Sequence, residues 1–137
     1  HGNYMQVMQR FDRKLFEFLL PKSGKAEIVE FTGSKTGDRV HLRFLSPFKI
    51  EWISDIVDHG LTDDTAFFID EGTKLPPGIS YWRHKHIVRK ISTDKSLIID
   101  DIEYRSINTL FTILLYPILF LSFFPRKKAY KQYFQIG

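Results

Sequence analysis

Two histidines and a tryptophan recur at every second position in one short stretch of the chain, ISYWRHKHIVRKI. Trp82, His84 and His86 are two residues apart, so on a β-strand their side chains point to the same face. The residues between them, Arg83 and Lys85, are cations that suit a face in contact with solvent. We therefore expect the face with the tryptophan and both histidines to point into the protein.

A carboxylate and a phenol are expected beside these histidines. The turn signal STDK follows the strand, and we expect it to pair Val88 with Asp100 on the next strand. In that register His84 faces Tyr104, and His86 lies diagonal to Asp100. The sequence thus predicts imidazoles next to a carboxylate.

The preceding strand is expected to add an aromatic ring and a second carboxylate. A turn over GTKLPPG would place Phe68 beside Trp82, with Asp70 near the rim of the site. Together the two turns predict a polar cluster bounded by aromatic rings.

Three roles fit this cluster. In the first, hydrogen bonds to Asp100 and Tyr104 satisfy buried imidazoles and hold the sheet together. In the second, the same groups bind the polar end of an otherwise apolar ligand. In the third, His84 and His86 bind a metal ion with Asp70 or Asp100 as a further ligand. Strong zinc sites usually offer three or four ligands, so we predict no metal site.

Catalysis has fewer candidates. His84 or His86 backed by Asp100 is the only arrangement that suits general acid–base chemistry. The serines are expected in turns, at strand edges or on a helix, and the chain has no cysteine, so no convincing nucleophile is present. The sequence favours a binding protein over an enzyme, and it predicts no cofactor.

The elements that must position this cluster form an α+β pattern. Residues Tyr4–Leu20 show helical spacing of apolar side chains, with Asn3 as the cap and Pro21 as the end. From Lys25 to Arg105 the period changes to two over six segments joined by short turn signals, which predicts an antiparallel meander. Residues 107–134 read as a second, longer helix.

The first part of that second helix is uncharged from Asn108 to Pro125, and it could be a membrane span or a buried helix. We expect it to cover the apolar face of the sheet rather than to span a membrane, because polar residues and Pro117 interrupt it. Leu114, Pro117 and Ile118 are then expected to face the interior, with a bend at the proline. Apolar residues surround the helix almost completely, so a surplus apolar face could meet a ligand, a second subunit or a membrane surface.

The composition fits one domain over residues 1–137. The net charge of +4 is too small and too scattered to indicate a nucleic-acid partner. The absence of cysteine excludes disulfides and thiolate metal sites and fits a reducing compartment, so we expect a cytoplasmic protein.

Three strings of this sequence resemble those of the START-like, or SRPBCC, superfamily, which includes the birch pollen allergen and the polyketide cyclases. They are FIDEGTKLPPGISYWRHKH, SLIIDDIEY and YPILFLSFFPRKKAYKQYF. The resemblance implies a helix-grip fold, in which a curved antiparallel sheet wraps around a long C-terminal helix and leaves an apolar cavity. The superfamily's first strand has no counterpart before Tyr4, which implies an unpaired sheet edge.

The resemblance implies binding or carriage of a hydrophobic small molecule, such as a lipid or a polyketide-like compound. Its apolar surface is expected from Trp52, Phe68, Trp82 and the Ile113–Phe120 face of the last helix, and its orientation from the polar cluster. Two alternatives remain at this point. One is a cyclase or hydrolase that uses a pocket histidine, and the other is an interaction module that docks its apolar helix on a partner or membrane.

Overall fold

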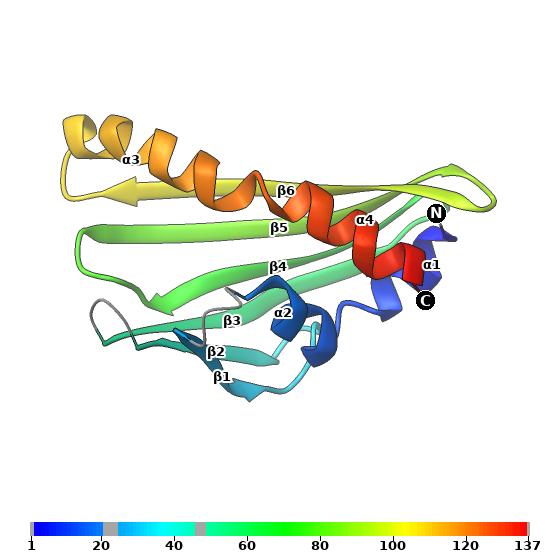
Figure 1. The fold of residues 1–137 in the computed structure, drawn as a ribbon, viewed down its shortest axis with the longest axis horizontal. Helices are drawn as coiled ribbons and strands as arrows, with labels where there is room; N and C mark the ends of the chain where they lie inside the picture. The colour runs from blue at the N-terminus through cyan, green and yellow to red at the C-terminus, as the bar shows by residue number, and fades with distance from the viewer. Residues whose placement is uncertain (1, 21–24, 46–48, 137) are drawn as a thin grey trace.

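The protein is an antiparallel meander of six strands with helices on one face (Figure 1). The computed structural model describes residues 2–20, 25–45 and 49–136. The strands are β1 (Ala26–Phe31), β2 (Arg39–Phe44), β3 (Ile50–Leu61), β4 (Thr65–Lys74), β5 (Ile79–Ser92) and β6 (Lys95–Ser106). Each strand pairs with the next in the sequence, so among the described strands β1 and β6 form the two edges. This confirms the predicted α+β meander.

The N-terminal helical segment consists of two short helices rather than the single helix predicted over Tyr4–Leu20. These are α1 (Tyr4–Gln9) and α2 (Arg13–Leu19). The break arises because Asp12 takes an extended conformation and its carboxylate accepts a hydrogen bond from the Leu15 amide, which starts a new helix. Asn3 caps α1 as predicted, whereas Pro21 lies outside the described residues.

The C-terminal helical segment is also divided. The apolar α3 (Thr109–Phe123) and the cationic α4 (Arg126–Ile136) follow one another directly, separated by Phe124 and Pro125 (Figure 1). The Asn108 side chain caps α3 by accepting a hydrogen bond from the Phe111 amide. Pro117 lies inside α3. The helices therefore meet near Pro125, eight residues beyond the proline at which we predicted a bend.

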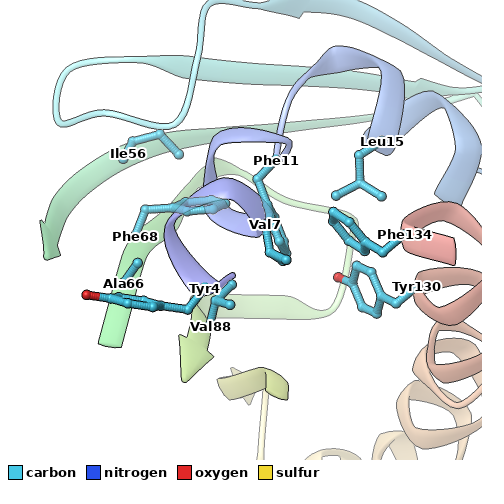
Figure 2. Packing of buried hydrophobic residues seen from close by; sticks show 10 residues of the cluster. All are labelled: Tyr4, Val7, Phe11, Leu15, Ile56, Ala66, Phe68, Val88, Tyr130 and Phe134. Carbon is cyan, nitrogen blue, oxygen red and sulfur yellow. The ribbon is translucent and has the colours of Figure 1, made fainter. Parts of the chain in front are cut away.

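The hydrophobic core lies where α1, α2 and α4 meet the sheet. Figure 2 shows Phe11 between the sheet residue Phe68 and two aromatic residues of α4, Tyr130 and Phe134. The Phe11 ring is 5.8 Å from that of Phe68 and 5.9 Å from that of Tyr130. Leu15 of α2 is fully buried in the same cluster. Thus α4, and not the more apolar α3, supplies the C-terminal part of the core.

The start of α3 is tied to the end of β6 by polar contacts. The Tyr104 hydroxyl donates to the Thr112 carbonyl at 2.7 Å, and the hydroxyls of Ser106 and Thr112 are also 2.7 Å apart. These contacts hold α3 along the edge of the sheet.

Candidate functional site

A cavity of about 380 Å³ lies between the sheet, α2 and the junction of α3 with α4. Aromatic and aliphatic side chains from β1 to β5 form most of its wall, and the helical residues complete it. The lining residues include Phe31, Val40, Leu42, Phe44, Trp52, Phe68, Trp82, Leu19, Leu119 and Phe123. Its polar residues are Ser54, Asp70, His84, His86, Ser122 and Arg126. The cavity is thus mostly apolar, with four polar residues on the sheet and two on the helices.

Asp70, His84 and His86 line the cavity as members of two histidine–aspartate pairs, whose fourth member, Asp100, lies behind them, and we call these residues the histidine–aspartate wall. His84 Nε2 donates to Asp100 Oδ1 at 2.9 Å, and His86 Nε2 donates to Asp70 Oδ2 at 2.8 Å. In the sheet Asp70 lies opposite His84, and Asp100 lies opposite His86. Each histidine therefore reaches the carboxylate that is opposite the other histidine, and the two pairs cross-link β4, β5 and β6.

The cluster has the predicted members on the predicted face, but the predicted registers were wrong. Val88 pairs with Ile98 rather than with Asp100, because the turn is tighter than expected and Ser92 pairs directly with Lys95. As a result Trp82, not His84, lies opposite Tyr104.

The register on the other side of β5 was wrong by four residues. Phe68 lies opposite His86 rather than beside Trp82, because β4 continues to Lys74 before the turn. Asp70 is consequently buried and not at the rim. Both errors are even numbers of residues, so every side chain kept its face of the sheet.

The two carboxyl groups of the cluster are held in the ionised form. Burial opposes ionisation of Asp70, but the hydrogen bond from His86 and the nearby imidazole charge outweigh burial and lower its pKa. Asp100 behaves in the same way: its hydrogen bond with His84 and the nearby His86, whose Nδ1 is 3.5 Å from Asp100 Oδ1, outweigh burial, and its pKa lies well below the usual range. Both carboxylates are therefore available to accept hydrogen bonds at neutral pH.

The two histidines respond in opposite directions. Burial and the charge of His86 lower the pKa of His84 to about 4, although the hydrogen bond with Asp100 partly compensates. Burial also works against protonation of His86, but the nearby Asp100 carboxylate and the hydrogen bond with Asp70 prevail and raise its pKa. His86 is the ring favoured for protonation, and His84 is neutral at neutral pH.

The arrangement of the two histidines bears on the metal hypothesis. The imidazoles of His84 and His86 are 3.7 Å apart at an interplanar angle of 29°, and Phe68 stacks on His86 at 4.2 Å. Possible ligand atoms of Asp70, His84 and His86 lie within 4.8 Å of one another. However, the Nε2 atoms of both histidines are hydrogen-bonded to aspartates, so an ion bound at either of these atoms would replace a hydrogen bond.

Arg126 is an unpredicted member of the site. It begins α4 and lines the cavity, and its guanidinium lies over the Phe123 ring at 4.4 Å. Its Nη1 atom is buried and has no hydrogen-bond partner among the described residues. A buried donor without an acceptor is costly, so this atom marks a place where an acceptor would be stabilised.

Tyr130 connects the site to the core. Its hydroxyl lies 3.4 Å from Asp100 Oδ1, and burial together with the Asp100 charge raises its pKa. Tyr130 also lines a second cavity, of about 460 Å³, between β6 and the α3–α4 junction, and Asp100 lines that cavity rather than the first. Phe123 and Arg126 line both cavities and form the wall between them.

Of the predicted ligand-contacting residues, those on the sheet are brought together and those on α3 are not. Trp52 and Trp82 meet edge to face at 4.8 Å in the cavity wall, although Tyr104 is engaged with α3 instead. Leu114 and Ile118 lie on the outer side of α3, and Pro117 is exposed as well. This corrects our expectation that they face the interior.

The residues of α3 that face inward are Phe111, Thr112, Leu115, Leu119 and Phe123, which recur at three- and four-residue spacing. The sequence could not identify this face, because α3 has apolar residues on every side and no polar stripe that marks the outside. The basic residue after the apolar run was visible in the sequence, but nothing there indicated that Arg126 turns inward.

The outer side of α3 is an apolar surface. None of the fifteen residues of α3, all of which are described, is buried. The helix counted through Thr109–Gln135 is long and apolar enough to cross a membrane by length and composition, and its most apolar part is not buried in the protein. The expectation that the C-terminal helical segment packs on the sheet is therefore confirmed, but only α4 supplies core residues, and α3 lies along β6 with none of its residues buried.

No protein-family model, curated protein or solved structure matches the chain. The six-stranded meander with its long C-terminal helical segment stands on the structure alone.

Proposed function

We propose that the protein binds a hydrophobic small molecule in the 380 Å³ cavity, with the polar end of that molecule at the histidine–aspartate wall. The observation that carries this proposal is the lining itself: a mostly aromatic and aliphatic wall with a few polar groups. Cavities of roughly 300–1,000 Å³ with such a lining are typical of small-molecule sites. Affinity would come from apolar burial, at roughly 25 cal/mol per Å² before the costs of binding.

The proposal draws further support from the START-like resemblance. The strings that carry that resemblance contribute Phe68, Asp70, Trp82, His84 and His86 to one cavity wall. In that superfamily the space between sheet and C-terminal helix receives apolar ligands. The chain shares the meander and the helical segment that such a site requires.

Arg126 favours a ligand whose polar end accepts hydrogen bonds. Its unpaired Nη1 is the cavity donor best placed for a carbonyl, carboxylate or phosphate oxygen, because the single N–H of neutral His84 is already donated to Asp100. The ligand class we propose is therefore an acyl chain or polyketide-like compound with an oxygen-rich end.

Acid–base turnover has less support from the same groups. His84, with a pKa of about 4, is a weak base at neutral pH, and His86 is only 2% exposed and already held by Asp70. Binding without chemistry is the simpler role for this wall.

Intrinsic fluorescence offers a direct test, because the chain has only two tryptophans and both line the cavity. A brominated C18 fatty acid should quench them in a saturable way, since bromine quenches indole at short range. The proposal would be contradicted if the brominated acid did not quench the tryptophans and if a non-brominated acid also neither competed with it nor shifted the emission.

Two substitutions on neighbouring positions of α3 provide the control. Ser122 lines the cavity, whereas Leu121 is on the outer side of the helix. Ser122→Phe fills the cavity and should weaken binding by about tenfold or more, and Leu121→Phe should leave it unchanged. Equal affinities for the two variants would place the ligand elsewhere.

The polar end is tested with Arg126→Gln and two ligands of one chain length, the brominated acid and its methyl ester. Loss of a charge-assisted hydrogen bond should weaken the acid by about tenfold and the ester much less. An equal loss for both would remove the role proposed for Arg126 while leaving apolar binding intact.

A further inference from the structure

The least expected feature of the molecule is the outer surface of α3. Its exposed apolar side chains are Leu110, Ile113, Leu114, Tyr116, Ile118, Phe120, Leu121 and Phe124. At 100° per residue they cover an arc of roughly 200° around the helix axis. We call this set the α3 surface.

Such a surface requires a partner. Single exposed apolar residues are normal, but a contiguous apolar patch of this kind marks an interaction site. The α3 surface continues at its C-terminal end into exposed cations, Lys127, Lys128 and Lys131. No aspartate or glutamate occurs anywhere from residue 107 to residue 137. The partner must therefore be apolar over a wide arc and anionic beside it.

We propose that α3 docks this protein on an anionic lipid bilayer, with the α3 surface among the acyl chains and the three lysines at the headgroup phosphates. Apolar burial of a helix combined with attraction of lysines to anionic lipids is the general basis of binding at a membrane interface. This mode is independent of the ligand cavity, which lies on the inner side of the same helix.

A bilayer suits the α3 surface better than a second copy of the chain. A two-fold dimer would cover only one side of each helix, and the cationic segment of one copy would find no acidic group in the same segment of the other. A lipid surface covers the whole arc and supplies the missing negative charge.

The helix lies in one leaflet rather than across the bilayer. The fifteen residues of α3 extend about 22 Å, which is less than the roughly 30 Å of the hydrocarbon core. The continuation in α4 cannot lengthen the span, because Tyr130 and Phe134 are buried in the protein core. Docking through α3 thus leaves the fold intact.

Vesicle co-sedimentation tests the proposal with the full chain. We expect the protein to sediment with vesicles of equimolar phosphatidylcholine and phosphatidylserine, and to bind pure phosphatidylcholine less tightly.

Leu114 and Leu121 are 59% and 68% exposed, so Leu114→Gln with Leu121→Gln should keep the fold and weaken partitioning by at least about tenfold. Lys127→Gln with Lys128→Gln should reduce binding by about tenfold on anionic vesicles alone.

The matched control changes two equally exposed aliphatic residues at the far end of the sheet. Leu61 and Ile91 are each 62% exposed, and the β5–β6 hairpin that follows Ile91 lies away from the start of α3 (Figure 1). Leu61→Gln with Ile91→Gln should sediment like the unmodified protein. The Ser122→Phe variant should also bind vesicles normally, which separates docking from ligand binding in the cavity.

Three results would overturn the proposal. The unmodified protein could stay in the supernatant with anionic vesicles, or Leu114→Gln with Leu121→Gln could bind as well as the control, Leu61→Gln with Ile91→Gln. The third is a dimer in detergent-free buffer that Leu114→Gln with Leu121→Gln dissociates, without vesicle binding. That outcome would make a second copy the partner of the α3 surface.

Discussion

The burial of two consecutive helices, α3 and α4, is the reverse of what their compositions suggest. α3 is almost wholly apolar, yet none of its residues is buried. α4 contains Arg126 and three lysines, yet Tyr130 and Phe134 on one of its faces complete the core. Burial in this segment follows the spacing of apolar residues rather than their number: α4 has a stripe that fits the sheet, and α3 has no side that could be left to water.

This difference suggests a division of work along one helical segment. α4 holds the fold together against α1 and α2. α3 contacts β6, closes the cavity with its inner side and leaves its outer side for another apolar environment. The α3–α4 junction, with Phe123 and Arg126, lies where these two roles meet.

The largest effect expected from this comparison is on global stability. Phe134 is 8% exposed and Phe124 is 62% exposed, so the same substitution can be made in both environments. Phe134→Ala should reduce the free energy of unfolding by about 3–5 kcal/mol, and Phe124→Ala by no more than about 0.5 kcal/mol. Urea denaturation monitored by circular dichroism measures both, and similar losses would refute the division between core and surface helix.

A smaller effect is expected from pH at the histidine–aspartate wall. Because the pKa of His84 is lowered from 6.5 to about 4 on folding, the unfolded chain binds this proton more readily. Protonation of His84 in the unfolded chain should therefore lower the free energy of unfolding as pH falls from 6.5 to about 4, by about 3 kcal/mol over the whole range. His84→Gln, which keeps a donor for Asp100, should remove this part of the acid sensitivity in urea midpoints.

His86 is expected to act in the opposite sense. Its pKa is raised in the folded state, so its stabilisation is fully present below pH 6.5 and is lost as pH rises through the folded value. His86→Gln should flatten the alkaline side of the stability curve. A variant that flattened the acid side instead would reverse the assignment of the two histidines.

The smallest effects on stability are expected from the helix caps, which compare α2, a helix packed on the core, with the exposed α3. Asp12 caps α2, which packs on the core, and Asn108 caps α3. Asp12→Ala should cost about 1 kcal/mol of global stability. Asn108→Ala should mainly increase hydrogen exchange of the first α3 amides, because α3 adds little to the core. Equal global losses would show that α3 is coupled to the fold more strongly than its exposure indicates.

Much of the fold could be predicted from sequence because alternation and turn signals are local. The six strands, the inward face of Trp82, His84 and His86 and the cap at Asn3 all follow from spacing within a few residues. Strand register depends instead on how tightly each turn closes and on bulges, such as the register shift between Lys90 and Ser92. For this reason the predicted partners of His84 and Phe68 were wrong although their faces were right.

The rotation of α3 and the role of Arg126 could not be predicted for a related reason. The inner face of an amphipathic helix can be identified because polar residues lie on the opposite face, and α3 has almost no polar residues. Moving the inner face from Leu114 and Ile118 to Leu115 and Leu119 is a rotation of one residue, which an apolar run leaves undetermined. Arg126 shares the inner side of α3, because it lies seven residues after Leu119 and three after Phe123, but the sequence could not show this while the rotation of α3 was undetermined.

The measurement that tests the central claim most directly is native mass spectrometry of the protein purified without detergent, before and after incubation with a mixture of fatty acids. We predict a single bound acyl compound per chain in the unmodified protein and in Leu114→Gln with Leu121→Gln, and none in Ser122→Phe. If the unmodified chain retained only its polypeptide mass under both conditions, the cavity would not be a binding site for such ligands. If Ser122→Phe kept the adduct and the α3 surface variant lost it, the ligand would be bound on the outside of α3.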